Sequence, residues 1–146
     1  MYISYGGDVT SIKTTTMATR SNIAIFKKAD KQGIHEVEYI YCHFDGYPSG
    51  VGATLLESYQ DIEKVRKLIA LGDISYLEKE VDIPEGVEHS FNKPIDGITV
   101  AYGRDRGETG TESRKKYIID KDRLSSLKEQ EYLYVYDEEQ EKWLHN

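Results

Sequence analysis

The sequence predicts a single α+β domain, in which an antiparallel β-sheet carries helices packed on one face. Near both ends, short segments alternate apolar and polar residues, as strands do, and turn residues separate them. The middle of the chain instead has an apolar stripe of helical period. Strands joined by hairpins favour antiparallel pairing with helices on one side. The length of 146 residues is typical of one domain.

The first two predicted strands form a hairpin. Residues 21–28 alternate so that Ile23 and Ile25 share one face. Turn residues at 30–33 lead into a second strand, residues 34–43. The proline that follows fixes its own φ and lacks an N–H donor, so it ends this strand.

Two helices are predicted next, over residues 53–60 and from Asp61 to Gly72. Asp61 is a suitable N-cap and Gly72 a suitable C-terminal residue. The second helix has apolar residues at positions i, i+3, i+6 and i+7, which predicts a buried stripe: Ile62, Val65, Leu68 and Ile69.

The second half of the chain predicts shorter elements. In order, we expect a helical turn at 74–81, a strand at 98–102, a polar loop at 103–113, a strand at 116–119, a weak helix at 122–129 and a closing hairpin of 132–136 with 142–144. Residues 1–16 are polar and aperiodic, so they are interpreted as an N-terminal extension, and the domain spans 17–146.

Composition narrows the classes of function. The net charge of −7 opposes general binding to nucleic acid, which needs a basic surface. No apolar run approaches the roughly 20 residues that cross a membrane, and no secretory signal is recognisable, so a cytoplasmic location is expected. The single cysteine, Cys42, excludes a disulfide within the chain. No cofactor or metal site is predicted, since the four histidines share no ligand spacing.

Tyrosine is unusually frequent, with 12 tyrosines against 3 phenylalanines. Tyrosine suits surfaces that are apolar on one side and wet on the other. We therefore expect a homodimer or a larger homo-oligomer in which some of this surface is shared.

Two segments hold the residue types of a binding site. The turn after the second strand contains His43, Phe44, Asp45 and Tyr47. A His–Asp pair can serve acid–base chemistry, but this aspartate can equally cap its own turn while the histidine bonds to the backbone. The glycine-rich entry to the first helix, residues 49–54, lacks the lysine of a P-loop.

The second segment, 102–107, contains Tyr102, Arg104 and Arg106. Arginine forks match phosphate oxygens, and tyrosine can stack on a base. With Arg20, this segment and the 43–48 turn are predicted to converge on one pocket. The alternative is an Arg–Asp network that braces a loop.

Four stretches resemble a widespread family of small proteins encoded by bacteriophages and mobile elements: 19–25, 41–48, 52–59 and 71–75. Small phage proteins of this kind include inhibitors of host defence. One group of inhibitors, the signal-sequestering "sponges" of the Lockin or Sequestin type, holds cyclic nucleotides or ADP-ribose derivatives without chemistry. From the size of the protein, its source and the chemistry of the predicted pocket, we expect a similarity to such sponges and hence an anti-defence role.

The preferred hypothesis is a non-enzymatic protein that binds a nucleotide-derived immune signal inside an infected host cell. In it, Arg20, Arg104 and Arg106 hold phosphate, aromatic residues stack on a base and Asp45 accepts from ribose. Two alternatives stay open. One is a phosphodiesterase-like enzyme with His43 as acid or base, and the other is an acidic protein inhibitor of a host defence protein.

Overall fold

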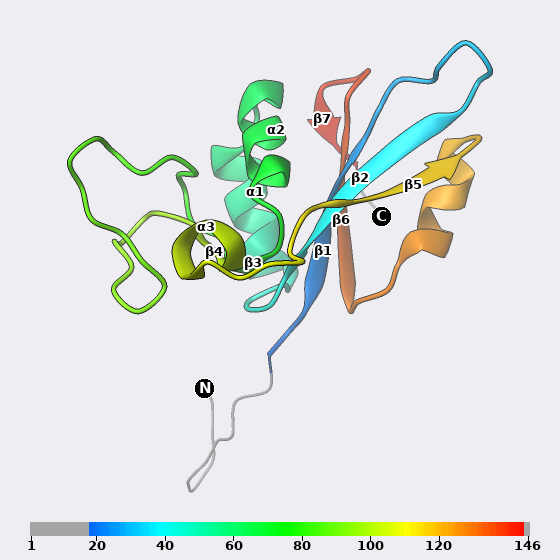
Figure 1. Ribbon diagram of the computed structural model, residues 1–146. Helices are drawn as coiled ribbons and strands as arrows, with labels where there is room; N and C mark the ends of the chain where they lie inside the picture. The colour runs from blue at the N-terminus through cyan, green and yellow to red at the C-terminus, as the bar shows by residue number, and fades with distance from the viewer. Residues whose placement is uncertain (1–17, 145–146) are drawn as a thin grey trace, which may run out of the picture.

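The computed structural model describes residues 18–144, which fold around a seven-stranded sheet of order β4-β3-β2-β1-β6-β7, with β5 beside β2 (Figure 1). The expected extension, residues 1–16, lies outside this range. The strands are β1 (Ser21–Phe26), β2 (His35–Cys42), β3 (Ile74–Tyr76), β4 (Val100–Ala101), β5 (Arg114–Ile118), β6 (Tyr132–Asp137) and β7 (Lys142–Trp143).

The α+β class is confirmed, but the sheet is mixed rather than antiparallel throughout. The expected hairpin of β1 and β2 is antiparallel, whereas β1 pairs with β6 and β2 pairs with β3 in parallel. The reason lies in the connections. Hairpin turns fix only strands that are adjacent in sequence, and the helical segment between β2 and β3 is a crossover, which returns the chain in the same direction.

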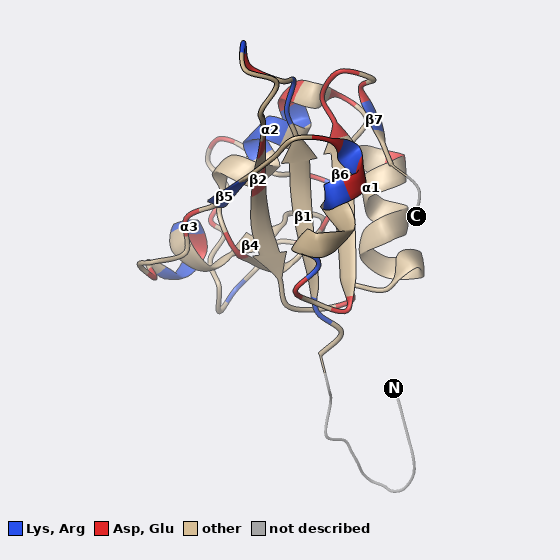
Figure 2. Ribbon diagram, turned by 90° about the vertical axis from the view of Figure 1, so that its right-hand side faces the viewer, with Lys and Arg blue, Asp and Glu red and all other residues tan. Residues whose placement is uncertain are grey.

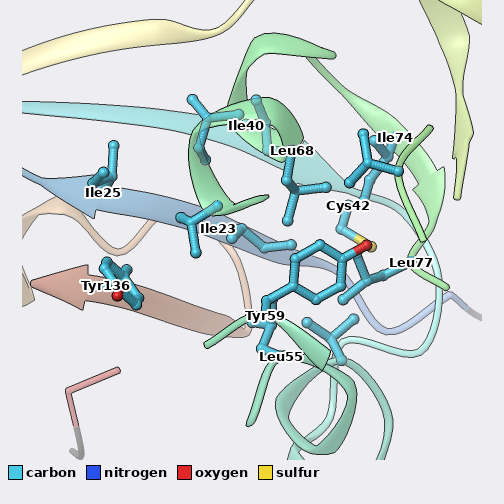
Figure 3. Packing of buried hydrophobic residues seen from close by; sticks show 14 of the residues in the cluster. Ile23, Ile25, Ile40, Cys42, Leu55, Tyr59, Leu68, Ile74, Leu77 and Tyr136 are labelled. Atoms are coloured by element: carbon cyan, nitrogen blue, oxygen red, sulfur yellow. The ribbon is translucent and has the colours of Figure 1, made fainter. Parts of the chain in front are cut away.

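That crossover consists of a π-helical turn, η1 (Pro48–Gly52), followed by α1 (Ala53–Ser58) and α2 (Ile62–Ala70). The predicted cap is present, since the Asp61 side chain accepts from the Glu63 N–H at 3.3 Å. Of the predicted stripe, Val65, Leu68 and Ile69 are buried in one cluster with Ile23 and Ile40, and Ile62 is partly buried against it. Figure 3 shows Leu68 beside Ile23 and Ile40 of the sheet.

The other face of the sheet has its own cover. A 3-10 helix, η2 (Lys121–Leu127), lies over β1 and β6, where Leu124 packs with Ala24 and Val135. In Figure 1 this helix lies on the side of the sheet away from α1 and α2. Strand β1 is therefore covered on both faces, and its six residues are all buried. In Figure 2 this strand is tan throughout, because it contains no charged residue.

Two local predictions were wrong. The segment predicted as a helical turn at 74–81 begins with strand β3, because Ile74 pairs with Cys42 in the sheet. The predicted loop after residue 102 begins with a helix, α3 (Tyr102–Arg106), which ends at Gly107 with φ of +74°. No helix within residues 18–144 is long and apolar enough to span a bilayer.

Candidate functional site

A cleft of about 660 Å³ opens at one end of the sheet. Its walls come from three segments that are far apart in sequence: the residues before β1, the residues after β2 and the residues before β6. They are Ala18 and Arg20, His43 and Phe44, and Glu129, Gln130 and Glu131.

The strand register explains why these segments meet. Ser21, the first residue of β1, pairs with Cys42 at the end of β2 and with Tyr132 at the start of β6. The residues one step beyond these pairs therefore gather at the same edge. The Arg20 backbone N–H donates to the Glu131 carboxylate at 3.4 Å, which joins two of the three walls.

Arg20 is the cationic group of the cleft. It is exposed, and within residues 18–144 its guanidinium has no carboxylate partner. The two glutamates of the cleft are not equivalent. Glu129 pairs with Lys116 at 2.8 Å and lies near Arg114, so hydrogen bonding from Lys116 holds its pKa below the usual range. The negative charge facing Arg20 is therefore partly neutralised.

The His43 ring is held by Tyr41, which lies two residues earlier in the chain and faces the same side. Its Nδ1 lies 2.7 Å from the Tyr41 hydroxyl, and its ring meets Phe44 edge-on at 4.5 Å between centroids. Partial burial, together with the positive charge of Arg20, lowers the pKa of His43. The imidazole is thus neutral at pH 7. The rings of His43 and Phe44 therefore line the cleft beside the cationic side chain of Arg20.

Asp45 and Tyr47 continue the turn but do not line the cleft. Asp45 adopts φ of +59°, and its carboxylate accepts from the Tyr47 hydroxyl at 3.1 Å. The His43 ring has its hydrogen bond with Tyr41 instead, so the two residues are not joined as an acid–base pair in this structure. Gly46 fixes the turn against β1, because an added Cβ would lie 2.8 Å from the Thr19 carbonyl oxygen.

The second predicted segment lies beyond β3. The His43 N–H donates to the Ile74 carbonyl, and the Tyr102 N–H donates to the Asp73 carbonyl, so the two segments flank this short strand. They are neighbours at the same region of the sheet, but residues 102–107 do not line the cleft.

Arg104 is committed to internal contacts. Its guanidinium donates to the carbonyls of Val81 and Thr99, at 2.5 and 2.8 Å, and to the Asp105 carboxylate at 2.8 Å. Asp105 is buried and also accepts from the Ala101 N–H at 2.8 Å and from His89 Nε2 at 3.2 Å. The His89 tautomer follows, because its Nδ1 accepts from the Ile95 N–H. This network braces the segment before β4 against α3.

Arg106 is more exposed and stacks on two rings. Its guanidinium carbon lies 4.3 Å from the centre of the Phe91 ring and 4.9 Å from that of Tyr102, and it pairs with Glu108 at 2.7 Å. Phe91 and Tyr102 are themselves stacked at 5.6 Å. Each predicted residue of this segment thus has partners inside the protein.

Sequence reasoning missed the 129–131 wall and Tyr41. The alternation of β2 places Tyr41 and His43 on one face, so Tyr41 could have been found from its spacing. Glu129 and Glu131 could not, because their position depends on the parallel pairing of β1 with β6. Among residues 18–144, no group of three or more histidine, cysteine or acidic side chains is arranged to hold a metal ion.

Comparison with family models, with curated proteins and with solved structures gave no match for this chain.

Proposed function

We propose that this protein binds and sequesters a small nucleotide-derived ligand without chemistry, in the cleft between Arg20, His43 and Phe44. The observation that carries the proposal is the meeting of an arginine with no carboxylate partner in residues 18–144, an aromatic edge and carboxylate acceptors in one open cleft. These groups complement a phosphate, a base and sugar hydroxyls respectively. The volume of about 660 Å³ lies within the range of small-molecule sites.

A binding role is favoured over catalysis by the surroundings of His43. A general acid–base histidine needs an orienting acceptor and a route for its proton. Here the Nδ1 partner is a tyrosine hydroxyl, and burial raises the pKa of that tyrosine, so it stays protonated at pH 7. The neutral imidazole serves as a surface for stacking and hydrogen bonding.

The biological role that we propose is anti-defence: the ligand is an immune signal, a cyclic nucleotide or an ADP-ribose derivative, held inside an infected host cell. This part of the proposal depends on the resemblance to small phage-encoded proteins. The protein is expected to act as a homodimer or larger homo-oligomer, which sedimentation at micromolar concentration would measure.

A ligand-release experiment tests the proposal. The purified protein is incubated with a panel of cyclic dinucleotides and ADP-ribose derivatives, freed of unbound ligand and then heated. Release of an intact ligand is expected. A converted ligand would support the phosphodiesterase-like alternative. Failure to retain any ligand would overturn the proposal and favour an acidic inhibitor of a host protein, which pull-down against host defence proteins would then address.

A further inference from the structure

Strand β5 has one edge that no other strand covers within residues 18–144. It pairs with β2 alone, and Figure 1 shows it at one margin of the molecule, next to η2. Among these residues, no backbone hydrogen bond joins its outer edge to another segment. An open edge presents a row of N–H and C=O groups to which a further strand can bind.

The strand register identifies the backbone groups on this edge. Successive residues of a strand direct their N–H and C=O groups to opposite sides. Glu36 faces β1, since its carbonyl accepts from the Lys27 N–H at 3.0 Å, so the next residue, Val37, faces β5. Val37 pairs with Lys116, whose backbone groups therefore face β2. The residues on either side of it direct their backbone groups away from the sheet: Lys115 and Tyr117.

The side chains along this edge are apolar to an unusual degree. Tyr117 and Ile119 are 62% and 56% exposed, the highest values among the large apolar side chains of the described residues. Beside them lies a groove of about 550 Å³ between β5 and η2, which Arg123 and Leu127 also line. Charged residues protect an edge strand from pairing, whereas exposed apolar ones favour pairing. The edge is therefore suited to a partner.

The same region is basic in an acidic protein. Residues 114–128 contain six basic residues and two acidic ones, whereas the whole chain has a net charge of −7. The ion pairs of the region neutralise Lys116 and Lys121, but Arg123 has no carboxylate partner within residues 18–144. The remaining positive charge favours an acidic partner.

We propose that the outer edge of β5 binds an extended segment of a partner protein in which acidic and apolar residues alternate, so that the segment adds a strand to the sheet. The backbone groups of Lys115 and Tyr117 hold the segment. Because side chains alternate, its apolar residues contact Tyr117 and Ile119 on one face, and its acidic residues face Arg123 on the other.

A second copy of this chain is a poor occupant of the edge. Pairing of β5 with itself would bring together two sets of three consecutive basic residues, 114–116, and like charges on paired strands repel. The groove beside β5 shares no lining residue with the ligand cleft. The inference therefore does not depend on the proposed function of that cleft.

Three peptides test the proposal with the full-length protein, by fluorescence anisotropy. The first alternates glutamate and valine over eight residues. The second has lysine in place of each glutamate, and the third is the acidic peptide with every backbone N–H methylated. The acidic peptide should bind. The lysine peptide should bind at least about tenfold more weakly because its charge is reversed, and the methylated peptide equally so because it cannot form the backbone hydrogen bonds.

Lys115→Pro and Lys115→Ala are matched variants of the protein. Both remove the same charge, but only proline removes the outward N–H. Because that N–H faces away from β2, proline is compatible with the strand, and the Tm values of the two variants should agree within about 4 °C. Lys115→Pro should bind the acidic peptide about three- to tenfold more weakly than Lys115→Ala. Lys116 stays unchanged, since it pairs with Glu129 of the cleft.

Several results would overturn the proposal. Equal binding of the acidic and lysine peptides would exclude charge recognition, and equal binding of the methylated peptide would exclude strand addition, whether or not the proline variant folds. Binding of single-stranded oligothymidylate with no binding of the acidic peptide would assign the basic surface to nucleic acid. Self-association that is present in Lys115→Ala and lost in Lys115→Pro would assign the edge to a second copy. Absence of binding by the acidic peptide would overturn the proposal as well.

Discussion

Arg20 directly precedes strand β1, and Arg104 lies in helix α3, directly after strand β4 of the same sheet. The two arginines nevertheless differ in their burial and in their hydrogen-bond partners. The Arg104 guanidinium donates hydrogen bonds to two backbone carbonyls and to the buried carboxylate of Asp105. The Arg20 side chain, in contrast, is exposed and lines a cleft. The sequence presents both as candidate phosphate ligands. The difference between them shows that partners and burial, rather than residue type, decide whether an arginine stabilises the fold or is available to a ligand.

The largest expected effect is the loss of stability in Arg104→Ala. Removal of the guanidinium leaves Asp105 buried with a weaker set of partners, which should cost about 3–5 kcal/mol of unfolding free energy. Ligand affinity should not change. Urea unfolding measures the loss, with Arg66→Ala as a control, since that exposed arginine contributes under about 1 kcal/mol. If Arg104→Ala instead kept the stability of the wild type and bound the ligand more weakly, Arg104 would be a ligand-binding residue and not a structural one.

Arg20→Ala should show the complementary behaviour. If its guanidinium holds a phosphate, affinity for the retained ligand should fall about ten- to a hundredfold. Stability should change by less than about 0.5 kcal/mol, because the side chain is exposed. Arg20→Lys should recover only part of the affinity, since the fork geometry is lost.

Calorimetric titration measures these affinities. Arg123→Ala is the control, because this exposed arginine also lacks a carboxylate partner within residues 18–144 and lies outside the cleft. Equal losses of ligand affinity in the Arg20 and Arg123 variants would indicate nonspecific attraction between charges. The cleft would then not be the ligand-binding site.

Acid should weaken the braced region through Asp105. Burial raises the pKa of this carboxyl, but hydrogen bonds from Arg104 and the Ala101 N–H, with the charge of Arg104, leave it below the ordinary value. Since the folded pKa is the lower one, the stabilisation is fully present above about pH 4, the unfolded value. It is lost as the pH falls through the folded pKa.

Asp105→Asn isolates this contribution. The variant should be less stable at pH 7, and its unfolding free energy should decline less steeply than that of the wild type below about pH 4. Denaturant unfolding from pH 2.5 to 7 gives both curves. Parallel curves would show that Asp105 titrates alike in the folded and unfolded states.

The smallest expected effect is that of Arg106→Ala. Its ion pair with Glu108 is exposed, and its stacking on Phe91 and Tyr102 adds a modest cation–π contribution, so stability should fall by about 1 kcal/mol or less. Ligand affinity should be unchanged, because the 102–107 segment does not line the cleft. A clear loss of affinity would show that the two segments bind one ligand together.

Local patterns in the sequence were sufficient for the elements with a clear period. The strands around Ile23 and Ile40 and the α2 stripe were predicted because burial on one face leaves a repeat of two or of 3.6 residues. Strand β3 was not predicted, because its three residues are too few to show a period and because it forms only by pairing with β2.

Local patterns in the sequence also predicted that Arg20 lies close to His43 and Phe44, but not the rest of the cleft. Arg20, His43 and Phe44 belong to segments joined by a hairpin, so local turn chemistry brings them together. Glu129 and Glu131 arrive through long-range parallel pairing, which leaves no local signal. The role of Arg104 depends on carbonyls of Val81 and Thr99, and a sequence does not show which carbonyls lie within reach.

The parallel pairing of β1 with β6 has a consequence for how the protein acquires its shape. β1 belongs to the early part of the chain, but the strand that completes one of its edges follows only after the helices, η2 and four other strands. Closing so long a loop is slow, because the entropy is lost before the contacts form. During synthesis β1 therefore presents an open, apolar edge, which is prone to aggregation until β6 docks. Since the cleft needs the same docking, a nascent chain has no binding site until the sheet is complete.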